Sequence, residues 1–65
     1  MDIYNFTTRE KEILKLLVNG YDNAEMSKKL AVSLHTVKAH ICNILQKLDA
    51  KDRTQAAIKA LNFFN

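Results

Sequence analysis

The sequence predicts an all-α fold, a compact four-helix domain. Its 65 residues include no proline and only one glycine, Gly20, whereas small strand-rich folds depend on tight turns that use these residues. Apolar residues make up 48 % of the chain and charged residues 26 %, an ordinary balance for a folded protein. Residues that favour the N-cap of a helix occur several times in the sequence. Each of them precedes apolar residues at helical spacing. We therefore expect one domain over residues 1–65, with 1–6 as a lead-in.

The first helix is predicted over about residues 8–19. Thr7 and Glu10 can form a capping box, in which the first side chain accepts a hydrogen bond from the first helical turn and the second bonds back. Gly20 stands where a left-handed residue would end this helix. Its apolar residues are Ile13, Leu14, Leu16, Leu17 and Val18.

A short second helix is predicted over about residues 23–30. Asp22 with Glu25 forms the second capping box of the sequence. We expect this helix to be anchored in the core through Met26 and Leu30.

The third helix, predicted over about residues 34–48, has the clearest amphipathic pattern. Ser33 is its expected N-cap, although Thr36 at the third position leaves the capping box incomplete. A stripe at steps of three and four is predicted to be buried: Leu34, Val37, Ile41, Ile44 and Leu48. Ala39 lies opposite that stripe when each residue advances by about 100°. Around it we expect His35, Thr36, Cys42, Asn43 and Gln46, with Lys38 able to reach the same side.

Asp52 and Gln55 form a third capping box and predict a fourth helix over about residues 53–62. This helix is apolar nearly all round, and a domain this small cannot bury every side. We therefore expect a self-complementary exposed patch from some of Ile58, Leu61, Phe63 and Phe64. Because the helix dipole disfavours a cation at a helix start, we expect Arg53 to have an acidic partner such as Glu10 or Glu12.

Basic charge is concentrated in the middle of the chain. Residues 26–48 contain four lysines, two histidines and no acidic residue and so carry +4, whereas the remaining residues carry −1. Such a distribution is expected of a surface that binds nucleic acid, and a solvated lysine-rich surface explains the charge alone equally well. The lysines are Lys28, Lys29, Lys38 and Lys47.

No residue pattern in the sequence predicts catalysis, a cofactor or a metal site. The only soft metal ligands, His35, His40 and Cys42, do not converge at their spacing on one helix. There is no glycine-rich phosphate loop and no nucleophile with a base beside it. From the residues alone, His40 is predicted to be a packed histidine at the edge of the core. The single cysteine and the absence of an apolar run predict a cytoplasmic protein with no membrane partner.

The second and third predicted helices, separated only by residues 31–33, form a helix-turn-helix. In this motif the second helix lies in the major groove and reads base edges, while the first crosses the phosphate backbone. Ala39, small and uncharged, would let the helix backbone approach DNA closely. Helix starts attract phosphate and lysines release counterions. We therefore expect backbone contacts near Asn23, Ser33, Lys28 and Lys29.

Five segments resemble the LuxR/NarL (GerE-type) DNA-binding domain and cover nearly the whole chain from Phe6. They are FTTREKEIL, GYDNAEMS, VSLHTVKAH, NILQKL and RTQA. The resemblance implies a four-helix effector domain of a transcription regulator, which binds DNA as a dimer through its third helix and often pairs through its fourth. It further implies base contacts from Lys38, Ala39 and Cys42, and phosphate contacts from Asn23, Ser33, Thr36 and His40. His35, placed on the exposed side by helical periodicity, is expected to flank them. The sequence departs from the family pattern at Ala31, where glycine is frequent, at Cys42, where a polar or basic residue is common, and at Ala50, which replaces a larger aliphatic residue.

The predicted function is sequence-specific binding of double-stranded DNA by a transcription regulator, such as a response regulator. Two alternatives remain open: a promoter-binding module like sigma-factor region 4, and a helical protein-interaction module with a basic face. On DNA we expect a homodimer paired through Ile58, with Gln55 and Asn62 around it. RNA polymerase is a further candidate partner. Whether the chain is a free-standing regulator or a fragment is left open.

Overall fold

The helices of the structure match the prediction closely. The computed structural model describes the backbone of residues 5–64 and the side chains of residues 5–62, and that part of the chain contains no strand. Its helices are α1 (Thr8–Val18), α2 (Asn23–Leu30), α3 (Leu34–Leu48) and α4 (Arg53–Phe64). The all-α fold is therefore confirmed, although α1 ends one residue before its predicted limit and α4 continues two residues beyond.

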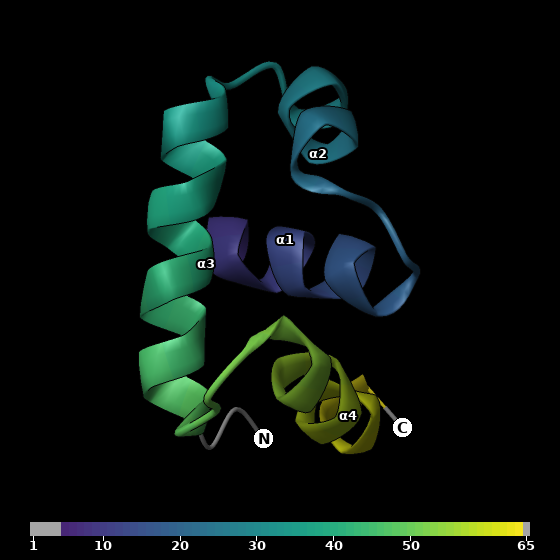
Figure 1. Ribbon diagram of the computed structural model, residues 1–65, viewed down its shortest axis with the longest axis vertical. Coiled ribbons are helices and arrows are strands. Elements are labelled where there is room, and N and C mark those ends of the chain that lie inside the picture. Colours follow the sequence, from purple (N-terminus) through teal and green to yellow (C-terminus); the bar gives the residue numbers. More distant parts are fainter. Residues whose placement is uncertain (1–4, 65) are drawn as a thin grey trace.

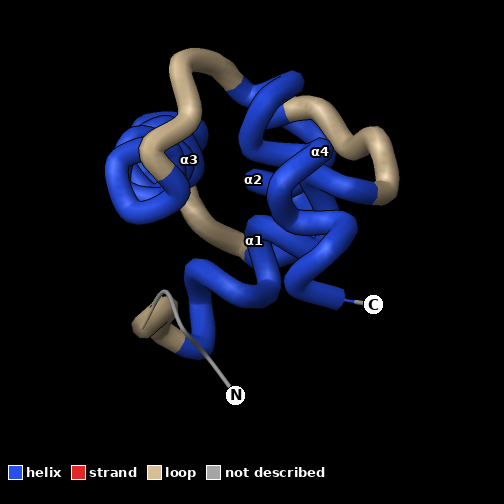
Figure 2. The backbone as a smooth tube through the Cα atoms, turned by 90° about the horizontal axis from the view of Figure 1, so that it is seen from below, coloured by secondary structure: helices blue, strands red, loops and turns tan. Residues whose placement is uncertain are grey.

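α3 lies along one flank of the molecule, and the other three helices pack against it (Figure 1). α2 lies near the N-terminal end of α3, α1 crosses its middle and α4 lies near its C-terminal end. In Figure 2, α3 is viewed nearly along its axis on one side, with α1, α2 and α4 grouped on the other. Fifteen helical residues span about 22 Å, and the longest dimension of the molecule is 27 Å. One side of α3 is thus uncovered over most of the length of the molecule.

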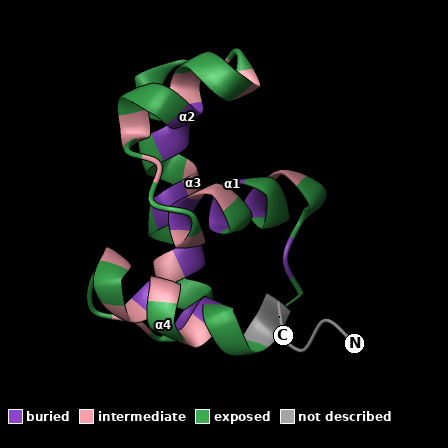
Figure 3. Cartoon of the chain, turned by 90° about the vertical axis from the view of Figure 1, so that its right-hand side faces the viewer, coloured by how far each residue is buried: buried purple, intermediate pink, exposed green. Residues whose placement is uncertain are grey.

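The core is built from the facing sides of all four helices, which Figure 3 shows in purple. Its buried apolar residues are Phe6, Ile13, Leu14, Leu17, Met26, Val37, Ile41, Ile44, Leu48, Ala56 and Ala60. Four of the five residues of the predicted α3 stripe are among them. The prediction was wrong for Leu34, which is 42 % exposed. As the first residue of α3, Leu34 lies beyond the packed core, so the right helical angle does not bury it.

The first two predicted capping boxes, at the starts of α1 and α2, are present. The side chains of Thr7 and Asp22 accept from the N–H groups three residues later, and two glutamates bond back, Glu10 and Glu25. The third predicted box is only half formed. Asp52 accepts from the N–H of Gln55, but the Gln55 side chain accepts from the N–H of Lys51 instead.

Three helices end at a left-handed residue, as predicted for Gly20. This glycine has φ +87°, and Ala31 and Asp49 adopt φ +57° and +54°. After each of them, the next N–H group donates to a carbonyl five residues earlier, which satisfies the last helical turn. Ala31 is one of the departures from the family pattern, and its Cβ makes this conformation unfavourable.

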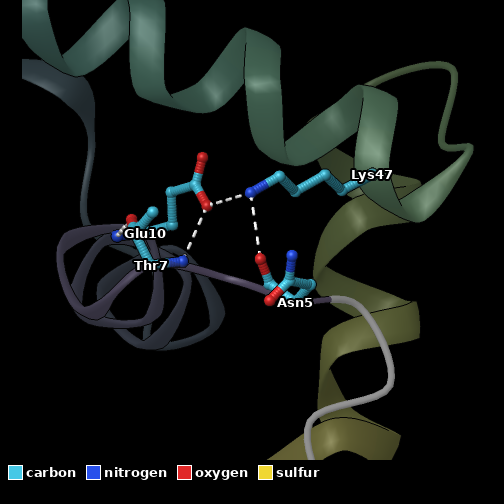
Figure 4. A network of polar contacts seen from close by, with 4 residues as sticks. All are labelled: Asn5, Thr7, Glu10 and Lys47. Carbon is cyan, nitrogen blue, oxygen red and sulfur yellow. Dashed lines mark hydrogen bonds and ion pairs between the residues drawn. The ribbon is translucent and has the colours of Figure 1, made fainter.

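An ion pair between the exposed Lys47 and the buried Glu10 joins α1 to the C-terminal end of α3 (Figure 4). Glu10 is 4 % exposed, and its Oε1 atom accepts from Lys47 Nζ at 2.6 Å and from the Thr7 N–H at 2.9 Å. Lys47 Nζ also donates to the carbonyl oxygen of Asn5 at 3.2 Å. Burial raises the pKa of Glu10, but the hydrogen bonds and the Lys47 charge outweigh that effect and hold the pKa below the usual range of a glutamate. Glu10 is therefore ionised, and its partner is Lys47 rather than Arg53.

Candidate nucleic-acid interface

The three predicted base-reading residues share the uncovered side of α3. Lys38, Ala39 and Cys42 are all exposed, while Val37 and Ile41 are buried on the opposite side of the same turns. The neighbouring side chains that are also exposed are His35, Asn43 and Gln46, and two others are half-buried, Thr36 and His40. The angular assignment made from the sequence is therefore correct, and His40 lies at the edge of the core.

The basic surface is smaller than the sequence suggests. Lys47 is one of the four lysines of the basic segment, but its charge is neutralised by Glu10. Lys28 and Lys38 are exposed. Lys29 Nζ lies 5.8 Å from the centroid of the Tyr21 ring, a cation–π distance that holds the side chain over the start of α2. Three lysines, on α2 and α3, therefore remain available for an anionic partner.

The turn between α2 and α3 is fixed by hydroxyl groups. Ser27 Oγ donates to the Val32 carbonyl at 2.6 Å. Ser33 Oγ accepts from the Thr36 N–H at 3.0 Å, and the two hydroxyls of this pair lie 2.9 Å apart. Their mutual bond uses one of the two hydroxyl hydrogens, whichever residue donates it. The other hydroxyl hydrogen of the Ser33–Thr36 pair is not used by this bond and lies at the start of α3.

Arg53 does not pair with Glu10 or Glu12, so that prediction was wrong. Its guanidinium lies against the start of α2, where Nη1 donates to Asn23 Oδ1 at 2.8 Å and Nη2 donates to the Tyr21 carbonyl at 3.3 Å. Glu10 is bound by Lys47, and Glu12 lies 3.7 Å from Arg9 on its own helix. Two neutral oxygens replace the expected carboxylate, one at the first residue of α2 and one in the preceding α1–α2 connection. No local sequence pattern marks this pair, because thirty residues separate the partners.

α4 presents an apolar surface to solvent. Ile58 is 60 % exposed and Leu61 is 48 % exposed, as predicted for part of the patch. Of the residues proposed for pairing around Ile58, Gln55 is half-buried and Asn62 is exposed. Two further patch candidates, Phe63 and Phe64, have side chains outside the described residues.

Sequence reasoning missed the role of Lys59, which ties α4 to α3. Its Nζ atom donates to the carbonyl oxygens of Leu48 and Asp49 at 2.9 and 3.0 Å. Carbonyls at the end of a helix lack partners within the helix, and a lysine there also interacts favourably with the dipole. The available signal was the predicted end of the third helix, because the last carbonyls of any helix lack partners within it.

The described residues contain no group of three His, Cys, Asp or Glu side chains that could hold a metal ion. No helix in residues 5–64 is both long enough and apolar enough to cross a membrane.

Comparison with known proteins decides the family. The bacterial regulatory proteins of the luxR family match residues 4–60. The chain belongs to this family. A solved structure, that of the transcription factor GerE, is similar with a TM-score of 0.82 and 41 % identity, covering 91 % of this chain and 88 % of that one. The chain is therefore a LuxR-type helix-turn-helix domain of DNA-binding transcription regulators, and the sigma-factor alternative is not favoured.

The related proteins are longer than this chain. The transcriptional regulatory protein LiaR of Bacillus subtilis is 52 % identical over 56 residues, which are 86 % of this chain and 26 % of LiaR. The response regulator protein VraR of Staphylococcus aureus is 50 % identical over 54 residues, which are 83 % of this chain and 26 % of VraR. The LuxR-type chain thus spans about a quarter of the length of these curated relatives.

Proposed function

We propose that this LuxR-type domain, one unit over residues 1–65, reads specific sequences in duplex DNA by placing α3 in the major groove. The uncovered side of α3 is the observation that carries the proposal. A major groove about 12 Å wide admits a helix of about 10–12 Å diameter. Ala39 at the outermost point of that side leaves space for the helix backbone to approach the bases.

Lys38, Ala39 and Cys42 are the proposed base contacts. A lysine donates to the O6 and N7 acceptors of guanine, and an alanine methyl group can pack on the methyl group of thymine. The thiol of Cys42 is a short and weak donor, so it contributes little hydrogen-bond readout. Most of the sequence discrimination by this surface is therefore assigned to Lys38.

The proposed phosphate contacts come from both helices of the motif. The spare hydroxyl hydrogen of the Ser33–Thr36 pair can donate to one phosphate oxygen. The charged groups are Lys28 and Lys29, each of which would release a counterion on contact. The remaining contact or flanking residues are Asn23, His35 and His40.

On DNA, we propose that two copies pair through α4, with Ile58 at the centre and Gln55 and Asn62 around it. The exposure of Ile58 and Leu61 supports this arrangement. A stable protein interface buries about 1,200–2,000 Å², more than one short helix face supplies. Pairing therefore depends on DNA, which holds two copies on neighbouring half-sites and raises their effective concentration.

In the whole protein, the proposed role is that of an effector domain in a response regulator, acting by binding rather than catalysis. The similarity to the response regulator VraR supports this role. A regulator of transcription works where bacterial DNA lies, in the cytoplasm, and RNA polymerase is its natural further partner.

Selection of bound sequences from random duplexes tests the proposed function. The affinity of the chain for the selected duplex and for a scrambled one is then measured at several salt concentrations. We expect a clear preference for the selected sequence and a linear fall of log K with log salt concentration. Equal affinity for all duplexes, or none for any, would contradict the proposal and favour a protein-interaction module.

A further inference from the structure

Arg53 links α4 to α2, two helices that pack mainly against other parts of the fold. α2 packs against α3, and α4 packs against α1 and α3. The Arg53 guanidinium bridges to the start of α2 through Asn23 Oδ1 at 2.8 Å and the Tyr21 carbonyl at 3.3 Å. Both contacts are partly buried, so solvent competes with them less than at an open surface. The side chain of Asn23 is thereby held at a defined position.

The chemistry of this contact fixes which way the Asn23 amide faces. A guanidinium has only donors, so the atom of Asn23 that lies against it must be the oxygen. The Nδ2 group, with its two donors, is consequently turned away from Arg53. None of the hydrogen bonds among the described residues uses Asn23 Nδ2. The structure thus holds an unused pair of donors at the first residue of α2.

We propose that Arg53 is a positioning residue for DNA binding, which holds the Asn23 amide so that Nδ2 donates to a phosphate oxygen. This inference rests on the proposed function and adds a residue from α4 to it. Without Arg53 the amide can flip, and the flipped form presents an oxygen acceptor to a phosphate that also only accepts. Arg53 removes the unproductive orientation and thereby connects the proposed pairing helix to the phosphate contact.

A double-mutant cycle tests the coupling. Arg53→Met keeps the apolar stem and removes the donors, and Asn23→Ala removes the amide. We expect each to weaken binding about tenfold on selected and scrambled duplexes alike, since a hydrogen bond to a charged group is lost and carries no sequence information. The double variant should bind no more weakly than either single variant. If the two losses multiply, or if Arg53→Met binds like the unchanged chain, the proposal is overturned.

The salt dependence separates positioning from direct contact. Arg53→Met should leave the slope of log K against log salt concentration unchanged, because Asn23 is neutral. If Arg53 itself touched a phosphate, the slope would fall by about one and the positioning role would be wrong. Should Arg53→Met fail to fold, Arg53→Gln carries the same cycle with Asn23→Ala, since a glutamine amide both donates and accepts and so no longer selects the Asn23 oxygen.

Asn23→Asp separates a DNA role from a structural clamp. A carboxylate still accepts from Arg53, more strongly than an amide, and a negative charge suits the first turn of a helix. Thermal stability should be equal or higher, while DNA affinity falls more than tenfold because the donors are replaced by a charge that repels phosphate. Unchanged affinity would show that the amide donors are not used and would overturn the proposal. Failure of the proposed function would appear differently, as an unsubstituted chain that shows no salt-dependent binding.

Discussion

α3 and α4 each leave one helix side uncovered, but the two uncovered sides have opposite chemistry. The side of α3 carries Lys38, Ala39 and Cys42 among other small or polar residues. The side of α4 carries the apolar residues Ile58 and Leu61. A polar surface remains well hydrated without a partner, whereas exposed apolar side chains gain free energy when they are covered. The difference supports the two proposed partners, DNA for α3 and another apolar surface for α4.

Polar contacts join the helices that carry these two surfaces to the rest of the fold. Glu10 and Lys47 join α1 to the end of α3, and Lys59 joins α4 to the last carbonyls of α3. Substitutions can therefore break the common scaffold, the α3 surface or the α4 surface separately. The expected effects decrease in that order.

Glu10→Ala should have the largest effect, because it breaks the ion pair that joins α1 to α3. It leaves the Thr7 N–H and Lys47 without their buried acceptor, and we expect a loss of about 2–4 kcal/mol in the free energy of unfolding. Urea unfolding measures this loss. The matched control is Glu12→Ala, whose exposed pairing with Arg9 is expected to contribute less than about 0.5 kcal/mol. Equal losses in the two variants would contradict the role of the Glu10–Lys47 ion pair.

The same ion pair predicts a pH dependence of stability. Because folding lowers the pKa of Glu10, its contribution to stability is fully present above the unfolded-state pKa and is lost as pH falls through the lower folded-state pKa. Unfolding free energy should therefore decrease as the solution is acidified below about pH 4.5. Glu10→Gln should flatten that decrease, and an unaltered pH profile in this variant would assign the acid sensitivity to other carboxylates.

Lys38→Ala breaks the α3 surface alone. We expect a loss of about 1–3 kcal/mol on the selected duplex and a relaxed preference at one or two base pairs. Competition binding with selected and single-substituted duplexes measures both. Lys51→Ala removes the same charge from an exposed position outside the motif and should keep the preference intact. An equal loss on all sequences would make Lys38 a phosphate contact only.

Ile58→Asp breaks the α4 surface alone. In a pair related by two-fold symmetry it places like charges close together, so cooperative binding to a duplex with two half-sites should fall by about tenfold or more. Affinity for a single half-site should hardly change. Quantitative gel-shift titration distinguishes the two quantities.

The matched experiment mixes Ile58→Asp with Ile58→Lys. Each variant alone repels itself, while the mixture brings opposite charges together and should recover part of the cooperativity. Cooperativity that survives in both single variants, with the fold intact, would move the pairing surface elsewhere.

Lys28→Ala and Lys29→Ala should have a smaller effect on the α3 side of the comparison. Each is expected to weaken binding a few-fold on all sequences and to lower the salt slope by about one if that lysine contacts a phosphate. Lys29 lies over Tyr21, so its loss should also remove a small stabilising contact, which thermal unfolding can detect. Unchanged slopes in both variants would place the phosphate contacts elsewhere.

Ala31→Gly should produce the smallest change, a gain of up to about 1 kcal/mol in unfolding free energy. It relieves the left-handed conformation at the entrance to α3, less the extra flexibility of glycine in the unfolded chain. Ala39→Gly is the control, since there glycine lies within a helix and should cost about 1 kcal/mol. A loss of stability in Ala31→Gly would show that the alanine methyl group makes a compensating contact.

The sequence by itself determined the features that depend on near neighbours. The helix starts at Thr7, Asp22 and Ser33 follow from side chains that bond three residues ahead. The exposed position of Ala39 follows from helical periodicity alone, because one turn relates a residue to the next three or four. The family motif is also a property of the linear chain. Interactions between near neighbours recur in different proteins that share the same short sequence pattern. For that reason they can be predicted.

Only the tertiary structure decided the contacts between distant residues. Glu10 and Lys47 are 37 residues apart, and Asn23 and Arg53 are 30 apart, so the partner of each charge depends on where the helices cross. The same crossing places Leu34 beyond the core although its helical angle is right. A charge or an apolar side chain has many possible partners in sequence and only one set within reach after packing. The folded geometry therefore decided that Lys47 pairs with Glu10 and that Arg53 contacts Asn23.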